Sequence, residues 1–520
     1  MRSDSGHTTS VWMDTASVTD YPPLRRDLRT SVCIVGAGIA GMTTAYLLAR
    51  AGRPVVVVDD GPVGGGETGR TTAHITAALD DRYSEIEKLH GEEGSRIAAE
   101  SHIAAINRVE SIASLEDIDC DFERVDGYLF LGGEDERSIL EEELEACHRA
   151  GLSDVALLDH APLDFFDTGP ALRFPRQAQF HPLKYLNGLG RAIIRDGGQI
   201  YCGSHVESVD DGEPAKVRTS DGFVVTADNV VVATNTPVND WVILHTKQAA
   251  YRTYVIAARV PRGSVPRGLY WDTPDPYHYV RLHEVDPALD PDRNDELLIV
   301  GGEDHKTGQA NDFEERFACL EEWTRKRFPM LGHVDFRWSG QVMEPVDYMG
   351  FIGKNPGTDE HIYIATGDSG NGMTHGTIAG ILLTDLILGR KNAWSQLYDP
   401  SRITLRAAGE FLKENLNVAV QYRDYATAGE VESLDQIEPG SGAVVRRGMK
   451  KIAVYRDEQG AIHERSAVCP HLYCIVDWNV VERSWDCPCH GSRFDPYGRV
   501  VNGPAITDLA PAEEEAQVSP

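Results

Sequence analysis

Long hydrophobic runs are missing from this sequence. No stretch of about eighteen consecutive apolar residues occurs, so we expect no membrane span. The first thirty residues also lack the basic, apolar and small-residue segments of a secretory signal. We therefore expect a cytoplasmic protein.

Positive charge is scarce relative to negative charge. The 520 residues include 50 Lys and Arg but 81 Asp and Glu, which gives a formal net charge of -31. Nucleic acid and anionic membranes would repel such a chain, so we exclude them as main partners. Internal repeats and low-complexity tracts are also absent. A chain of 520 residues is too long for one hydrophobic core, so about two or three domains are expected.

Cysteine is sparse and unevenly placed. Of nine cysteines, five are scattered, whereas Cys469, Cys474, Cys487 and Cys489 crowd into one short segment. In a reducing compartment, such a cluster indicates a metal site before it indicates disulfides.

The cysteine-rich segment also holds two histidines at regular spacing. Cys469-Pro-His471 and Cys487-Pro-Cys-His490 are separated by fifteen residues, and this C-x-H and C-x-x-H pattern resembles Rieske proteins. The resemblance implies a [2Fe–2S] cluster with Cys469 and Cys487 on one iron and His471 and His490 on the other. A zinc ribbon is the alternative. The C-x-H spacing and the Gly-Ser pair at residues 491–492 favour the Rieske arrangement.

The other two cysteines of the segment are Cys474 and Cys489. They stand where respiratory-complex Rieske proteins, which this segment resembles, have a disulfide between the cluster loops; two reduced thiols are the alternative. Those proteins also have a tyrosine two residues after the serine, where this chain has Phe494. Loss of that donor to a ligand sulfur disfavours the reduced cluster, so a lower potential is expected. The family also places the histidine ligands near solvent, which predicts an electron exit there.

A glycine motif lies near the other end of the chain. The apolar strand 32–35 runs into Gly36-Ala-Gly38-Ile-Ala40-Gly41 and a helix, and a second strand, 55–58, ends at Asp59. This context predicts a dinucleotide site, with the helix N-terminus at the phosphates and Asp59 at the ribose hydroxyls.

Residues 30–395 resemble the D-amino-acid oxidase and sarcosine oxidase superfamily, which implies that the nucleotide is FAD. Further segments carry this resemblance: 69–74, 230–234, 338–353 and 364–374. The FAD contacts that it implies there are Gly69, Arg70, Thr71, Thr72, His74, Ala233, Thr234, Gly340, Asp347, Gly367, Gly370, Gly372, Met373 and Thr374. His74 lies near where dimethylglycine dehydrogenase relatives attach FAD covalently, and a noncovalent contact is the alternative.

The family places an antiparallel sheet over the flavin, and residues 251–260 and 277–281 would supply part of it. On a strand, Tyr279 and Arg281 share one face, so they are our candidates for substrate binding. A surface arginine that pairs with a carboxylate is the competing interpretation. We expect His305 to be structural.

The predicted architecture is a mixed α/β chain: a Rossmann-type FAD-binding domain with an inserted antiparallel substrate sheet, followed by a small all-β Rieske domain. We place an N-terminal arm at 1–29, the FAD domain at 30–395, a helical connector at 396–427 and the Rieske domain at 428–520. On the connector, Leu412 and Leu416 share one helical side, which predicts packing onto a neighbour.

The superfamily mostly oxidises C–N bonds of amines or amino acids. We therefore predict a dehydrogenase that passes electrons from FAD through the cluster to an external acceptor, such as a protein. One alternative is a reductase that feeds an oxygenase, although no second glycine motif after a strand is present. Another is a redox sensor without turnover.

Overall fold

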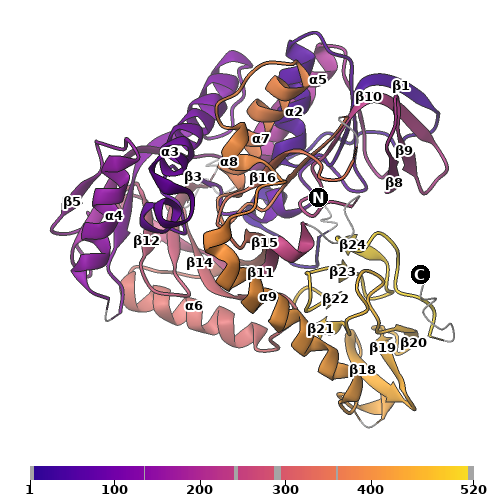
Figure 1. Cartoon of the computed structure of the whole chain (residues 1–520). Helices are drawn as coiled ribbons and strands as arrows, with labels where there is room; N and C mark the ends of the chain where they lie inside the picture. The colour runs from indigo at the N-terminus through magenta and orange to yellow at the C-terminus, as the bar shows by residue number, and fades with distance from the viewer. Residues whose placement is uncertain are drawn as a thin grey trace.

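The computed structural model describes residues 5–133, 135–238, 244–285, 294–358, 361–431 and 433–512. A large N-terminal unit contains two sheets, and a smaller C-terminal unit of short strands lies against it, shown in yellow in Figure 1. No helix within these ranges is both long enough and apolar enough to span a membrane. The mixed α/β architecture that we predicted is confirmed.

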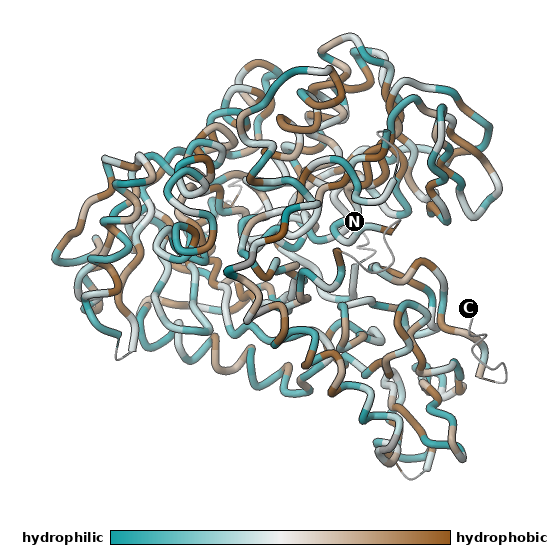
Figure 2. The backbone as a smooth tube through the Cα atoms, in the orientation of Figure 1, coloured by the Kyte–Doolittle hydropathy of each residue, from teal (hydrophilic) through white to brown (hydrophobic). Residues whose placement is uncertain are grey.

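The first sheet has a parallel centre, as the glycine motif predicts. Its strands are β16 (Phe351–Lys354), β17 (Ile362–Thr366), β10 (Val224–Val232), β1 (Leu28–Val35), β2 (Val55–Val58) and β7 (Gln199–Tyr201), in that order, with β8 (Val206–Asp210) and β9 (Ala215–Thr219) beside β10. β1 pairs in parallel with both β2 and β10. The central strands of this sheet are apolar because helices cover the sheet. In Figure 2 the hydrophobic stretches gather in the interior of this unit.

The second sheet is mostly antiparallel. Its strands are β15 (Val334–Pro345), β11 (Gln248–Pro261), β14 (Asp295–Lys306), β13 (Tyr279–Glu284), β12 (Leu269–Asp272), β4 (Glu123–Phe130), β6 (Ala171–Gln179) and β3 (His74–Ile75), with β5 (Ala156–Leu158) beside β6. Long strands at 251–260 and near 277–300 were predicted, and β11, β13 and β14 occupy those segments.

Helices surround the two sheets. They are α1 (Val11–Thr15), α2 (Ile39–Arg50), α3 (Tyr83–Leu115), α4 (Arg137–Arg149), α5 (Pro182–Arg195), α6 (Phe313–Arg327), α7 (Gly372–Ile387), α8 (Ser395–Tyr398) and α9 (Ala408–Gln421). Short 3-10 turns are η1 (Glu67–Arg70), η2 (His245–Lys247), η3 (Leu405–Ala407), η4 (Tyr422–Ala426) and η5 (Leu434–Gln436). α3 changes direction at Gly91, whose φ is 73°.

The C-terminal unit has two small antiparallel sheets. One contains β18 (Ser441–Arg447), β19 (Lys450–Arg456) and β20 (Ile462–Ser466), and the other contains β21 (Asp477–Asn479), β22 (Ser484–Asp486), β23 (Arg493–Phe494) and β24 (Val500–Asn502). α9 leads into this unit (Figure 1). The predicted packing through the leucine side of α9 is wrong, because Leu412 is 59% and Leu416 is 57% exposed. The helix instead packs through Val418 onto the core of the C-terminal unit.

Candidate functional site

A cavity of about 310 Å³ lies between the parallel and the antiparallel sheet. Most predicted FAD contacts line it: Gly36, Gly38, Ala40, Asp59, Arg70, Thr71, Thr72, His74, Ala233, Thr234, Gly340, Gly367, Gly370, Gly372 and Met373. Segments far apart in the sequence therefore meet at one place, as a cofactor site made by several loops requires.

The glycine loop at the end of β1 fits a pyrophosphate. Gly36 has a φ of 107°, and a Cβ there would lie 2.3 Å from the Ala233 carbonyl oxygen. Gly38 is the N-cap of α2 and offers no side-chain cap, and Ile39 and Ala40 of the first turn line the cavity. The Ile39 amide donates to Thr68 Oγ1 at 3.1 Å. Asp59 accepts hydrogen bonds from the amides of Ala37 at 2.5 Å and Gly61 at 2.7 Å, which fix its carboxylate at the cavity wall.

His74 lies in the cavity wall with both ring nitrogens engaged. Its Nδ1 is 3.0 Å from Thr72 Oγ1, and its Nε2 is 3.4 Å from the Val280 carbonyl oxygen. A carbonyl can only accept, so Nε2 carries the proton and Nδ1 accepts from the threonine hydroxyl. Burial lowers the pKa of His74 to about 3, which keeps the ring neutral.

Four other predicted FAD contacts lie away from the cavity. Gly41 and Gly69 pack against the backbone of the neighbouring loops, and Thr374 donates to the Asn371 carbonyl within α7. Asp347 instead forms a buried ion pair with Arg402, with an N–O distance of 2.7 Å. This pair anchors the chain after α8 to the loop after β15.

The two substrate-binding candidates on β13 have different surroundings. Tyr279 lines the cavity, and its hydroxyl lies 2.7 Å from Thr253 Oγ1 on β11. Arg281 does not reach the cavity: its guanidinium is buried and donates to the carbonyls of Thr72, Ala73 and Phe180 at 2.9–3.1 Å. The shared-face argument placed both side chains correctly on one strand face but could not foresee these carbonyl acceptors.

His305 lies on β14, where we expected a structural role. Its Nε2 is 2.8 Å from the hydroxyl of Tyr254, and its Nδ1 is 2.8 Å from the Lys306 carbonyl.

In the C-terminal unit, two loops bring the predicted cluster ligands together. Cys469 and Cys487 are buried, and their thiols are hydrogen-bonded to each other. The rings of His471 and His490 are 5.1 Å apart. Burial alone would raise the pKa of the Cys469 thiol, but hydrogen bonds with Cys487, Ser492 and backbone amides bring it below its ordinary value.

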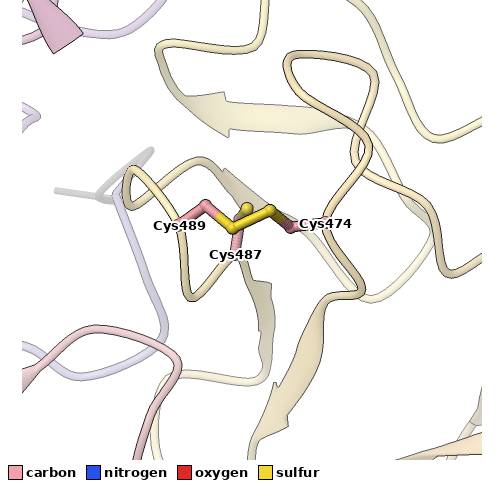
Figure 3. A group of neighbouring side chains, drawn as sticks. All are labelled: Cys474, Cys487 and Cys489. Carbon is pink, nitrogen blue, oxygen red and sulfur yellow. A yellow bond between two sulfur atoms is a disulfide. The ribbon is translucent and has the colours of Figure 1, made fainter. Parts of the chain in front are cut away.

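A disulfide joins the two loops, as the resemblance to respiratory Rieske proteins implied. Cys474 and Cys489 are bonded with their Cα atoms 6.4 Å apart. Figure 3 shows Cys487 beside this bridge, and the three sulfur atoms lie within 4.8 Å of one another. Sulfur atoms held in a disulfide are not thiolate ligands, which leaves Cys469, Cys487 and the two histidines as the predicted ligand set.

The histidine edge of the cluster site faces the N-terminal unit. His471 is 7% and His490 is 3% exposed, so the expected position near solvent is wrong. The ring of His245, in η2, packs edge-on at 5.0 Å from His471 and 6.5 Å from His490. The buried Nδ1 of His490 has no hydrogen-bond partner, which fits an imidazole nitrogen reserved for iron.

Hydrogen bonds connect the cavity wall to the cluster loops. Gln341 lines the cavity and donates from Nε2 to the carbonyl of Gly491 at 3.1 Å. On the other side, residues 500–503 and Ala505 also line the cavity, and the Ala505 amide donates to Ser492 Oγ at 3.0 Å. Ser492 in turn contacts the Cys469 sulfur. The two sites are therefore separated by very few residues.

Gly491 allows this close approach. Its φ is 76°, and a Cβ there would lie 2.3 Å from the Ala250 Cβ on β11. Any side chain at residue 491 would push the cluster loop away from the antiparallel sheet.

A buried charge network joins the two units, and our sequence reasoning missed it. Arg70 and Glu482 form an ion pair at 3.1 Å with both side chains 0% exposed. Arg252 and Arg493 flank Asp486 at 3.8 and 3.2 Å. Charge partners so far apart in the chain leave no local spacing signal.

The N-terminal arm completes this network. Thr8 donates to Glu482 and accepts from Arg70, and Arg493 donates to the Ser5 carbonyl. Trp12, fully buried in α1, donates to the Thr71 carbonyl at 2.6 Å. The described part of the arm therefore contacts both units.

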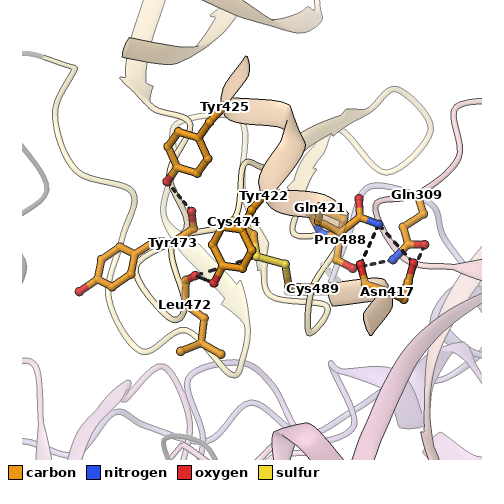
Figure 4. Close-up of a disulfide and its surroundings, with 10 residues drawn as sticks. All are labelled: Gln309, Asn417, Gln421, Tyr422, Tyr425, Leu472, Tyr473, Cys474, Pro488 and Cys489. Carbon is orange, nitrogen blue, oxygen red and sulfur yellow. Dashed lines mark hydrogen bonds between the residues drawn. A yellow bond between two sulfur atoms is a disulfide. The ribbon is translucent and has the colours of Figure 1, made fainter. Parts of the chain in front are cut away.

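The connector holds the first cluster loop from outside. In Figure 4 the hydroxyls of Tyr422 and Tyr425 donate to the carbonyls of Leu472 and Tyr473, both at the base of the disulfide. Gln309, after β14, donates to the Pro488 carbonyl of the second loop at 2.8 Å.

Comparison with known proteins matches both units to families. Residues 31–386 match the FAD dependent oxidoreductase family, and residues 427–513 match the Rieske [2Fe-2S] domain. The chain is 31% identical over 505 residues to YhfW of Bacillus subtilis (strain 168), whose name describes a Rieske 2Fe-2S iron-sulfur protein, and the match covers 96% of each chain.

Two further relatives match the N-terminal unit. Gamma-glutamylputrescine oxidoreductase of Escherichia coli (strain K12) is 30% identical over 400 residues, covering 74% of this chain and 89% of that protein. The crystal structure of glycine oxidase from Geobacillus kaustophilus superposes with a TM-score of 0.61 at 17% identity, covering 72% of this chain and 99% of that one. The chain therefore belongs to the FAD dependent oxidoreductase family and is an FAD-dependent oxidoreductase that binds FAD and carries a Rieske [2Fe-2S] centre.

Proposed function

We propose that this protein oxidises a C–N bond of an amine or amino acid and passes the electrons through the Rieske cluster to a one-electron acceptor outside the chain. The observation that carries the proposal is the shared wall between the cavity and the cluster loops, made by Gln341, residues 500–503 and Ala505. A cluster so close to the flavin site fits an electron path between them.

In this proposal the cavity would hold FAD, which would supply the two-electron oxidant: the substrate carbon would lose a hydride and its nitrogen a proton, leaving an imine. The amides at the start of α2 bind the pyrophosphate, and Asp59 binds the ribose. His74 contacts the flavin without a covalent bond, because its Nδ1 lone pair already accepts from Thr72. Tyr279 and Thr253 present their hydroxyls to the substrate from the antiparallel sheet.

Cys469 and Cys487 would hold one iron of the cluster, and His471 and His490 the other. The cluster would supply a one-electron carrier. His245 excludes water from the histidine edge and fills the space between the cluster ligands and the N-terminal unit. The buried histidines support electron entry at this edge, while the exit would lie elsewhere on the C-terminal unit.

The names of two relatives concern amino compounds, gamma-glutamylputrescine and glycine, which supports C–N oxidation. The test is an anaerobic screen in which amines and amino acids are added to the holoprotein and the flavin absorbance is followed. We expect at least one of them to bleach the flavin. Bleaching by NADH or NADPH with no response to any amine would favour the reductase, and no bleaching by either class would favour the sensor.

A further inference from the structure

The substrate end of the cavity has an unusual set of charges. Three carboxylates reach it from different elements: Asp80 after β3, Asp304 on β14 and Glu344 on β15. Asp368, after β17, also lines the cavity. These carboxylates lie close enough to repel one another, because the negative charges of Asp80 and Asp304 both raise the pKa of Glu344.

Hydroxyl groups and backbone amides hold these carboxylates, and no basic group does. Asp80 accepts from the Tyr277 hydroxyl at 2.6 Å, and Asp368 accepts from the Met343 amide at 3.1 Å. Within the described ranges, none of the four carboxylates forms an ion pair with Lys, Arg or His, and Asp304 Oδ1 is buried without a hydrogen-bond partner.

Three buried acids outside the cavity show how an arginine partner changes a carboxylate. Glu482 pairs with Arg70, Asp486 with Arg493 and Asp347 with Arg402. Each of these three acids has a pKa held below its ordinary value despite burial, because the guanidinium stabilises the anion. In the cavity, where Asp80 is exposed and Asp304 is partly buried, no described guanidinium stabilises the anion, and removal from water raises the pKa of Asp304 to about 7.

A substrate carboxylate would find no lysine or arginine to pair with in the described wall at this end of the cavity. Of the described residues that line the cavity, none is a lysine and Arg70 is the one arginine, which is already paired with Glu482. Arg281, the expected partner for an acidic group, is bound to backbone carbonyls outside the cavity.

A metal ion does not account for the carboxylates either. Side chains of His, Cys, Asp or Glu can hold a metal ion where three or more of them bring their ligand atoms close together. Among the residues that the structure describes, one such group has all its ligand atoms within 4.8 Å of one another, and it consists of the three cysteines of the C-terminal unit. The cavity carboxylates are therefore too dispersed to share one ion, and their spread suits charges distributed along an organic molecule.

We propose that the substrate is a cationic amine that carries a second ammonium group and no carboxylate beside the reacting carbon, as in an aliphatic diamine. This inference rests on the proposed function, because it specifies the substrate of the same site. Asp80, Asp304 and Glu344 bind the ammonium groups, and the Tyr279 ring closes the pocket over them.

The test uses the holoprotein and isothermal titration calorimetry. Its three probes share a four-carbon chain and differ in their end groups: 1,4-diaminobutane, 1-aminobutane and 4-aminobutanoate. We expect the diamine to bind at least about tenfold more tightly than either other probe, which corresponds to about 1.4 kcal/mol. Asp304→Asn and Glu344→Gln should each weaken diamine binding by about tenfold or more.

Glu303→Gln is the matched control. Glu303 precedes Asp304 on β14, does not line the cavity and instead lies 3.4 Å from His278 Nε2. This variant should bind the diamine like wild type. Equal or tighter binding of 4-aminobutanoate, or unchanged diamine binding in Asp304→Asn and Glu344→Gln, would overturn the inference. If the diamine binds as expected but no amine reduces the flavin, the proposed oxidation fails while the charge preference stands.

Discussion

At the scale of single residues, His74 decides how FAD is attached. Covalent attachment would need a ring nitrogen with a free lone pair, but Nδ1 accepts from Thr72 and Nε2 donates to the Val280 carbonyl. We therefore predict that acid precipitation releases all FAD into the supernatant. Flavin fluorescence that stays with the precipitated protein would show a covalent link.

Phe494 is the second informative residue. It is fully buried in the core around the cluster loops and offers no hydroxyl to a ligand sulfur. We predict that Phe494→Tyr raises the cluster midpoint potential, because a new hydrogen bond to sulfur favours the reduced state. A bond worth about 1 kcal/mol corresponds to roughly 40 mV for one electron. A redox titration followed by EPR measures the shift. An unchanged or lower potential would mean that the new hydroxyl does not donate to a ligand sulfur.

At the scale of elements, the loop before β22 holds the two units together through Glu482. Burial alone would raise its pKa, but Arg70, Arg252 and Arg493 lower it strongly. We predict that Glu482→Gln lowers the free energy of unfolding by about 3 kcal/mol or more, because it leaves buried guanidinium groups without their anion. Denaturant unfolding measures the difference.

The pH dependence of this difference follows from the direction of the shift. A carboxylate with a depressed pKa in the folded state stabilises the fold above its unfolded pKa, near 4.5, and this contribution is lost as the pH falls further. The gap in unfolding free energy between wild type and Glu482→Gln should therefore be constant near neutral pH and shrink below about pH 4.5. A gap that grows on acidification would contradict this assignment.

What could be predicted from the sequence depended on how local each signal was. The glycine loop at 36–41 and the ligand pairs at 469–471 and 487–490 are short motifs. In the structure Gly36 and Gly38 line the cavity, and the rings of His471 and His490 lie 5.1 Å apart. The partners of Arg281 and Glu482 could not be predicted, because tertiary packing brings them together from distant parts of the sequence. The exposed leucines of α9 show the same limit: helical periodicity identifies an apolar face but not what covers it.

At the scale of the whole molecule, two redox sites share one interface. The predicted cluster ligands come from the C-terminal unit, whereas the cavity proposed for FAD is built mostly from the N-terminal unit. We predict that Cys469→Ser abolishes the EPR signal of the reduced cluster and leaves about one FAD bound per chain, because the flavin loops do not depend on the metal. Metal analysis and flavin absorbance measure both contents. Loss of FAD together with iron would show that the two sites fold as one.

The central claim is that electrons leave the flavin through the cluster. It is tested most directly with a His471→Ala variant that retains FAD but lacks the cluster, using an amine that bleaches the wild-type flavin. We predict that anaerobic flavin reduction stays close to wild type, while turnover with cytochrome c as a one-electron acceptor falls to background. Turnover with cytochrome c that is unchanged in the cluster-free protein would contradict the claim.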